Sequence, residues 1–245
     1  MAVTYIGRER GNASNGADKA LTLTDIGTLL ENDFVIVAAG IGGDSATGDL
    51  TMSVQEAGWT KQCDIFQDHT KSCNFAVFTK VMGSTPDNTV TIDGSGDIAD
   101  SLVGLAMGFR GVDTTTPLDV VIQTAKNPDT WTANPPSVDY LDADAWTVMM
   151  SMCAHARNSG VTLTLPTGYV TDSYTLTADD INDTSMAIGY NSAPADPEDP
   201  GTVAVSGASD STSYSWAAAT LALRPAAAAG SIIPQIMHNR RMQQG

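Results

Sequence analysis

Short runs of Val, Thr, Ile and Phe recur along the chain, separated by Gly, Asp, Asn, Ser and Pro. Runs of strand length that end at turn-forming residues are typical of an all-β sandwich. Sustained spacing of apolar residues at three and four positions, which marks an amphipathic helix, is hard to find. The pattern therefore predicts an all-β fold.

Five segments of the first half return in the same order in the second half, at an offset between about 110 and 114 residues. The matches are NDFVIVAAGIGGDS with DAWTVMMSMCAHARNSG, LTMSVQEAGWT with VTLTLPTGYV, CNFAVFTKVM with TSMAIGYNSA, NTVTIDGSG with GTVAVSGAS, and GLAMGFRGV with AATLALRPA. They pair Phe34 with Trp146 and Arg110 with Arg224. Five ordered matches favour an internal duplication. The alternative is that β-sandwich segments share such patterns generically.

The duplication predicts the domain organisation. We expect residues 1–112 and 113–225 to form two tandem β-sandwich (jelly-roll-like) domains of about eight short strands each. Residues 226–245 follow as an extended C-terminal tail. The last strand of each unit is expected in the core, through Leu102, Leu105 and Phe109, and through Trp216, Leu221 and Leu223.

The glycine cluster in DFVIVAAGIGGDS resembles the start of a dinucleotide-binding turn. Gly40 and Gly42 fit the first two glycines of G-x-G-x-x-G, but the third position is Ser45. The following residues are strand-like, so no helix N-terminus is predicted to hold a phosphate. The matching segment of the second unit also has no glycine cluster. We therefore interpret these glycines as a loop that leaves a buried strand.

The charge of the chain excludes some partners. Its 12 basic and 28 acidic residues give a net charge of −16. Such an acidic chain is repelled by nucleic acid and by anionic lipid surfaces. No signal peptide and no apolar run near 20 residues is evident, so no membrane span is expected.

Residues with catalytic or metal-binding chemistry are sparse. Three cysteines suit reduced core thiols, with a Cys63–Cys73 disulfide as the alternative. The histidines lack zinc-ligand spacing, and no G-x-S-x-G motif occurs. The cysteines are Cys63, Cys73 and Cys153, and the histidines are His69, His155 and His238. We expect no enzyme activity, no metal and no cofactor.

Two weaker alternatives concern loops. Acidic clusters such as Asp142 with Asp144, or DGSGD from Asp93, could hold a structural calcium, although solvated loops are the simpler interpretation. Trp59, Trp131 and Tyr169 could form a sugar-binding platform, although such aromatic residues more often lie at a core edge.

The C-terminal tail differs in composition from the rest of the chain. It has Arg240 and Arg241 and no acidic residue, so its charge is +2 beside a body of −18, with 10 basic and 28 acidic residues. We predict that it is an arm that binds a partner subunit, with a frayed terminus as the alternative. The predicted contact residues are Ile232, Ile233, Ile236, Met237, Arg240 and Arg241.

The succession AGWT, FAVFTKV, TVTI and GFRGVD resembles repeat units of tailed-phage virion structural proteins. In those units a P-x-G-W turn precedes a Y-K strand, a T-V-T strand and a closing A-F-R-G-V-D strand. This chain keeps Gly58, Trp59, Lys80 and the run 109–113. The second unit is more divergent and loses Val-Asp after Arg224. The resemblance implies a virion component, and it supplies no active-site residues.

The function expected from the sequence is a structural virion component of a tailed bacteriophage, either a head decoration or a fibre-like surface protein. The expected partners are other virion proteins of the capsid, neck or tail, and further copies of the chain. Its expected location is the virion, assembled in the host cytoplasm. The alternative is a carbohydrate- or receptor-binding adhesin module of the tail, which would bind a host surface glycan.

Overall fold

A computed structural model of the chain describes residues 2–44, 46–96, 100–127, 132–156, 161–176, 182–207 and 214–227. Within these residues the chain is all-β, as the sequence predicted, with antiparallel strands and one short 3-10 helix, η1 (Leu23–Asp25). The expected core strands are confirmed, since Leu102, Phe109 and Leu221 are buried.

The first half forms a five-stranded antiparallel sheet in the order β1-β7-β3-β5-β4, and a separate two-stranded sheet, β2-β6. The bounds are β1 (Thr4–Ala13), β2 (Lys19–Thr22), β3 (Phe34–Asp44), β4 (Thr60–Gln67), β5 (Lys71–Val81), β6 (Thr89–Ile92) and β7 (Ser101–Arg110).

The second half repeats this arrangement with a five-stranded sheet, β8-β14-β9-β12-β11, and a two-stranded sheet, β10-β13. The bounds are β8 (Gln123–Asn127), β9 (Trp146–Ala156), β10 (Thr162–Thr164), β11 (Val170–Leu176), β12 (Asn182–Asn191), β13 (Ala204–Ser206) and β14 (Ser215–Leu223).

The register of the two large sheets also corresponds. Phe34 at the start of β3 lies opposite Phe109, and Trp146 at the start of β9 lies opposite Leu223. These positions are related by the offsets of the sequence matches. Origin by duplication, and the unit boundaries themselves, stay predictions.

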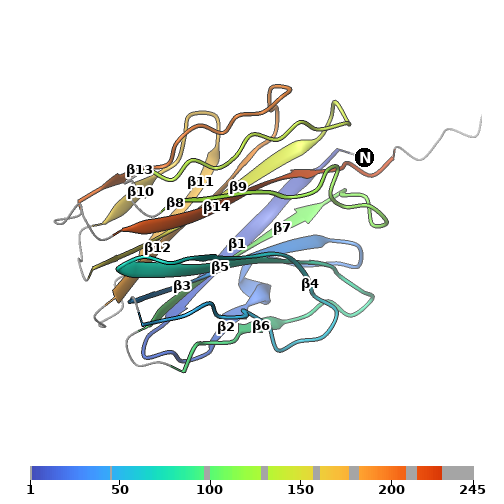
Figure 1. The fold of residues 1–245 in the computed structure, drawn as a ribbon. Helices are drawn as coiled ribbons and strands as arrows, with labels where there is room; N and C mark the ends of the chain where they lie inside the picture. The colour runs from blue at the N-terminus through green and yellow to red at the C-terminus, as the bar shows by residue number, and fades with distance from the viewer. Residues whose placement is uncertain are drawn as a thin grey trace, which may run out of the picture.

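The two large sheets pack face to face, and the largest core cluster lies between them (Figure 1). Phe75 and Val103 of the first half and Met152 and Leu221 of the second belong to this cluster. Because these side chains exclude water on both sheets at once, the two halves are held together by the hydrophobic effect.

The small sheets cover the outer faces of the large ones (Figure 1). In the first half Leu21 of β2 lies opposite Val90 of β6, and both are buried against the large sheet. In the second half Leu163 of β10 takes part in a corresponding outer cluster with Trp216 of β14. The protein therefore has four layers, which bury both faces of each large sheet.

The glycine cluster lies inside a strand, so the prediction of a loop at this point was wrong. β3 continues through Gly40, Gly42 and Gly43 to Asp44. A Cβ atom at Gly40 would lie 2.8 Å from the sulfur of Met152, and one at Gly42 would collide with the Thr184 hydroxyl. Glycine is needed here because the second sheet approaches β3 closely.

Candidate functional site

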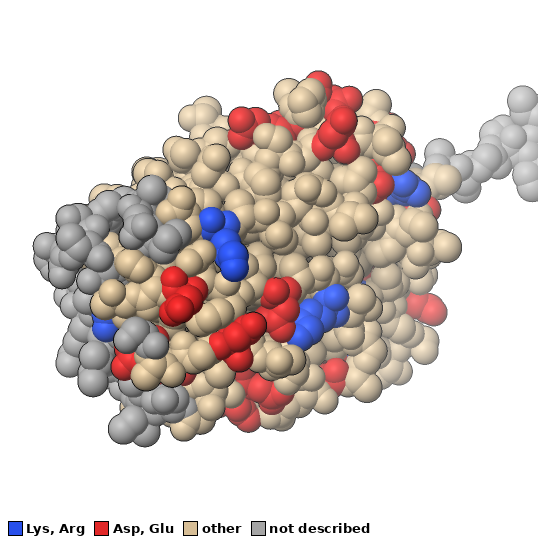
Figure 2. Space-filling model, viewed as in Figure 1, with Lys and Arg blue, Asp and Glu red and all other residues tan. Residues whose placement is uncertain are grey.

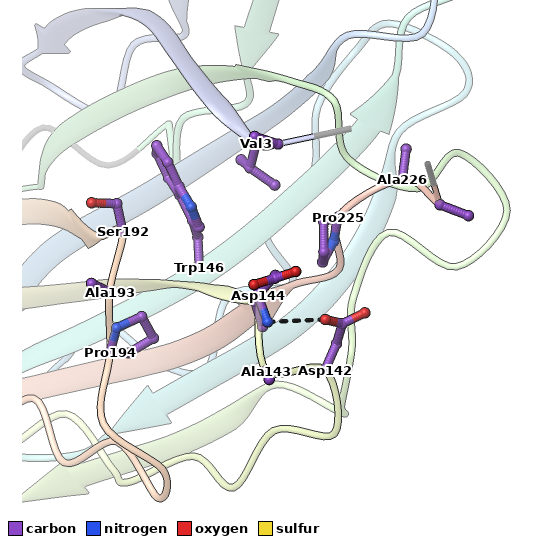
Figure 3. Close-up of a pocket in the computed structure, with 13 residues that line it drawn as sticks. Val3, Asp142, Ala143, Asp144, Trp146, Ser192, Ala193, Pro194, Pro225 and Ala226 are labelled. Atoms are coloured by element: carbon purple, nitrogen blue, oxygen red, sulfur yellow. Dashed lines mark hydrogen bonds between the residues drawn. The ribbon is translucent and has the colours of Figure 1, made fainter. Parts of the chain in front are cut away.

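A hollow in the described surface lies where residues 2–3 approach residues 225–227, and we call it the tail-root hollow. It has a volume of about 740 Å³. Four short segments line it, as Figure 3 shows: residues 2–3, 142–146, 192–194 and 225–227. The last of these runs directly into the predicted C-terminal tail, so the tail starts at the wall of this hollow.

Two lining positions of the tail-root hollow carry alanine where the first half carries larger side chains. At the corresponding place of the first half, Asp33 and Met82 are both buried, and the Met82 N–H donates to the Asp33 carbonyl at 2.7 Å. The sequence matches place Ala145 and Ala193 at these two positions of the second half. At Ala193 the second half therefore lacks the volume of a methionine side chain, whereas Asp119 supplies the buried carboxylate of this half in place of residue 145.

Two carboxylates stand on the loop that enters β9. Asp142 accepts a hydrogen bond from the Asp144 N–H at 3.0 Å, which fixes the turn (Figure 3). Asp144 is exposed and Asp142 is half-buried. Both carboxylates are therefore available to a cation from outside. Acidic side chains are also the more widespread charge on the face drawn in Figure 2.

A buried ion pair fixes this loop to β14. Asp119 is fully buried at its side chain and bonds Arg224 Nε at 2.8 Å. It also accepts the backbone N–H groups of Leu141 and Asp142. Burial opposes ionisation, but the N–H donors of Asp142 and Leu141 and the Arg224 guanidinium outweigh it, so the pKa of Asp119 is lowered. The ionised carboxylate holds the loop in place.

One aromatic ring, that of Trp146, lines the hollow, and two further rings support it from behind. Trp146 stacks on Tyr190 with ring centroids 5.4 Å apart and an interplanar angle of 7°. Tyr190 in turn contacts Tyr5 of β1 at 4.8 Å. The half-buried Trp146 is therefore supported by strands of both halves and presents a rigid apolar surface to a ligand.

The tail residues that the sequence singled out, Ile232, Ile233, Ile236, Met237, Arg240 and Arg241, lie outside the described residues. The sequence did not predict the tail-root hollow. The sequence shows the acidic pair in LDADAW, but nothing in it places this pair beside residues 225–227.

A second cluster of polar side chains is enclosed in the second half. His155 Nε2 lies 2.9 Å from the Ser185 hydroxyl, and Asp183 lies opposite His155 on the neighbouring strand. All three side chains are fully buried. Nucleophilic catalysis needs a path from solvent to the serine, and this arrangement leaves Ser185 closed to a substrate.

The three cysteines are free thiols. Cys63 lies opposite Val77, and Cys73 lies opposite Gln67, so the alternative Cys63–Cys73 disulfide does not form. Burial raises the pKa of both thiols to about 12. Because the thiolate is the reactive form, these cysteines are poor nucleophiles near neutral pH.

Within the described residues, no group of three or more His, Cys, Asp and Glu side chains could hold a metal ion. Asp93, a suggested calcium ligand, accepts hydrogen bonds from Ser53 and from Gln55 instead. Likewise, no helix of the described chain has the length and apolar character needed to cross a membrane.

The suggested sugar-binding aromatics do not form an open platform. Trp59 is partly buried against the outer core of the first half, and its Nε1 donates to Asp87 at 3.2 Å. Tyr169 is 7 % exposed, and its hydroxyl bonds Glu198 and Thr147. Trp131 lies outside the described residues.

Replacement of Trp59 by alanine should lower stability, because Trp59 packs against the core. We expect a measurable loss in urea unfolding, smaller than the roughly 3–5 kcal/mol that a fully buried aromatic residue costs. Trp59→Phe, which keeps a ring, should lose less. If Trp59→Ala keeps its full stability but abolishes binding on a glycan array, Trp59 belongs to a ligand site instead.

Comparisons with known proteins give this chain no relative. No protein-family model, no curated protein and no solved structure matches it.

Proposed function

We propose that this chain is a structural component of a tailed-phage virion, a head decoration or a fibre-like surface protein, whose C-terminal tail is a protein-binding arm for a partner subunit of the particle, either another virion protein or a further copy of the chain. The sequence resemblance at Gly58, Trp59, Lys80 and residues 109–113 supports the class of protein. The proposal assigns no catalytic activity to the chain.

One observation carries the proposal: the abrupt change of composition after residue 225. The body has a charge of −18, whereas the tail has a charge of +2, five Ile and Met residues and no acidic residue. Apolar side chains gain stability only when they leave water, and a 20-residue segment with a proline gains little by folding alone. A partner surface would bury these apolar side chains and so provide the stability that the tail does not gain by folding alone.

The body of the protein is suited to holding such tails in a fixed position. Its halves share a buried core, and the aromatic contacts of Tyr5, Trp146 and Tyr190 tie both sheets together next to the tail. A rigid body that presents tails in several copies raises their effective concentration at a repetitive surface such as a capsid.

No specific observation favours the adhesin alternative. The described candidates for a glycan platform, Trp59 and Tyr169, are engaged in packing and in hydrogen bonds.

Deletion of residues 230–245 should abolish binding to particles. We expect the full chain to co-sediment with phage particles at a fixed copy number, and the truncated chain to remain in the supernatant. Circular dichroism and thermal unfolding should show that the truncated body is still folded.

The proposal is wrong if the truncated chain binds particles with unchanged affinity, or if the full chain never co-sediments with them. Selective binding of the full chain to a glycan array, without binding to particles, would support the adhesin alternative instead.

A further inference from the structure

We propose that the tail-root hollow is the docking site for the C-terminal tail of a second copy of this chain, so that two copies exchange tails. The inference rests on the proposed function of the tail as a protein-binding arm and names its partner. The juxtaposition that carries it is an open hollow, lined by Trp146 and edged by Asp142 and Asp144, at the place where the tail itself begins.

The hollow and the tail complement each other in chemistry. The hollow offers Trp146, Val3, Pro194 and Pro225 as apolar surface, beside two carboxylates. The tail offers isoleucines and methionines followed by Arg240 and Arg241. Arginine pairs with carboxylates through charge-assisted hydrogen bonds, which also fix the position of the arm.

The position of the hollow favours an exchange between two copies. Only residues 228–231 separate Ala227, on the wall, from Ile232, so these two residues lie five steps apart and at most about 18 Å from each other when the chain is extended. Each copy carries the start of its tail and its hollow at the same place. Two copies that face each other there can therefore exchange tails around a two-fold axis. Such an interface is closed, and both hollows are filled.

The charge of the chain also favours a tail from another copy. Two bodies of −18 repel each other, so a cationic contact across the interface favours self-association. The tail supplies two arginines without an accompanying acidic residue. Insertion of each tail into the other copy places these cations against the partner's acidic edge, where they offset the repulsion.

The test uses one change on each side of the contact in the full-length chain. Asp144→Arg reverses the charge of an exposed position on the hollow. A second chain carries Arg240→Asp and Arg241→Asp in the tail. Each variant alone should self-associate at least about tenfold more weakly than the wild type in analytical ultracentrifugation, because repulsion replaces attraction at a contact between charges. The matched control is Asp68→Arg, which makes the same charge change at an exposed turn between β4 and β5 and should associate like the wild type.

A mixture of the two weakened variants decides between exchange and self-docking. If tails are exchanged, the two variants are complementary in both hollows of a mixed pair, and the mixture should recover dimers with close to the wild-type affinity. If each tail binds its own hollow, mixing changes nothing and the proposal is overturned. A wild-type chain that stays monomeric at high concentration also overturns it.

Filling of the hollow gives an independent test. Ala193 is exposed, and the sequence match places a methionine, Met82, at this position in the first half. Ala193→Met should weaken self-association without loss of thermal stability, whereas unchanged association contradicts the proposal. Particle co-sedimentation of the same variants separates the two ideas, because binding to particles with a failed mixing test leaves the proposed function intact.

Discussion

Arg110→Met should destabilise the protein by about 3 kcal/mol. Arg110 makes two hydrogen bonds to Asp33, from Nε at 2.8 Å and from a terminal nitrogen at 2.7 Å. The Asp33 side chain is 1 % exposed, so the substitution leaves a buried carboxylate without its counter-charge. Breaking such a pair costs roughly 3–5 kcal/mol. The lower end applies because the Arg110 side chain is 45 % exposed, so water can partly replace it.

Urea unfolding of two further variants would check the cause. Lys61→Met removes the exposed Lys61–Asp64 ion pair and should cost less than about 1 kcal/mol. In the double variant Asp33→Asn, Arg110→Met, no buried charge remains, so it should be more stable than Arg110→Met. If Arg110→Met costs no more than Lys61→Met, the Asp33 carboxylate is stabilised by other groups and our account of this pair is wrong.

The same arginines show how far the sequence determines the fold. The matches placed Arg110 and Arg224 at corresponding ends of β7 and β14, and both positions form ion pairs. The partners differ, however. Arg110 binds Asp33, but the position that matches Asp33 is Ala145, and Arg224 instead binds Asp119 of the segment between β7 and β8. Strand pattern and order could be predicted because they depend on local alternation and turn residues. The choice of partner depends on loop paths that the local sequence does not encode.

The candidate site was less predictable than the fold. The acidic character of Asp142 and Asp144 and the unusual tail were visible in the sequence. The hollow is formed by four segments that are distant in the chain, with alanine at positions 145 and 193. An alanine gives no sequence signal of a hollow until its surroundings in the structure are known. In the sequence, only the match of Ala193 with Met82 of the first half points to the smaller side chain at this place.

The glycines of β3 show why one prediction failed. A run of small residues after an apolar segment usually marks a turn, because glycine tolerates turn conformations. Here glycine is needed for a different reason, the close approach of the second large sheet to β3. That the two large sheets face each other is a tertiary feature, and the pattern along one strand does not reveal it. The sequence pattern therefore predicted the strand but placed its end too early.

Gly42→Val should cost about 3–5 kcal/mol by forcing the two large sheets apart. The new side chain would collide with the Thr184 hydroxyl and lie near the Asp183 carbonyl, which is backbone and cannot rotate away. Overpacking typically costs roughly 1–3 kcal/mol. Displacement of Thr184 also breaks its buried hydrogen bond to the Ser101 carbonyl, 3.0 Å long, and an unsatisfied buried group adds roughly 1–3 kcal/mol.

Two comparisons make this prediction specific to the contact between the sheets. Gly48→Val introduces the same side chain at an exposed glycine with open space around it, and should change stability by no more than about 0.5 kcal/mol. Thr184→Ala gives the new valine room, so the double variant Gly42→Val, Thr184→Ala should lose less stability than the sum of the two single variants. Additive losses in this double-mutant cycle would mean that the two residues do not interact. A favourable coupling would instead locate the strain between β3 and β12, where the first half of the chain meets the second.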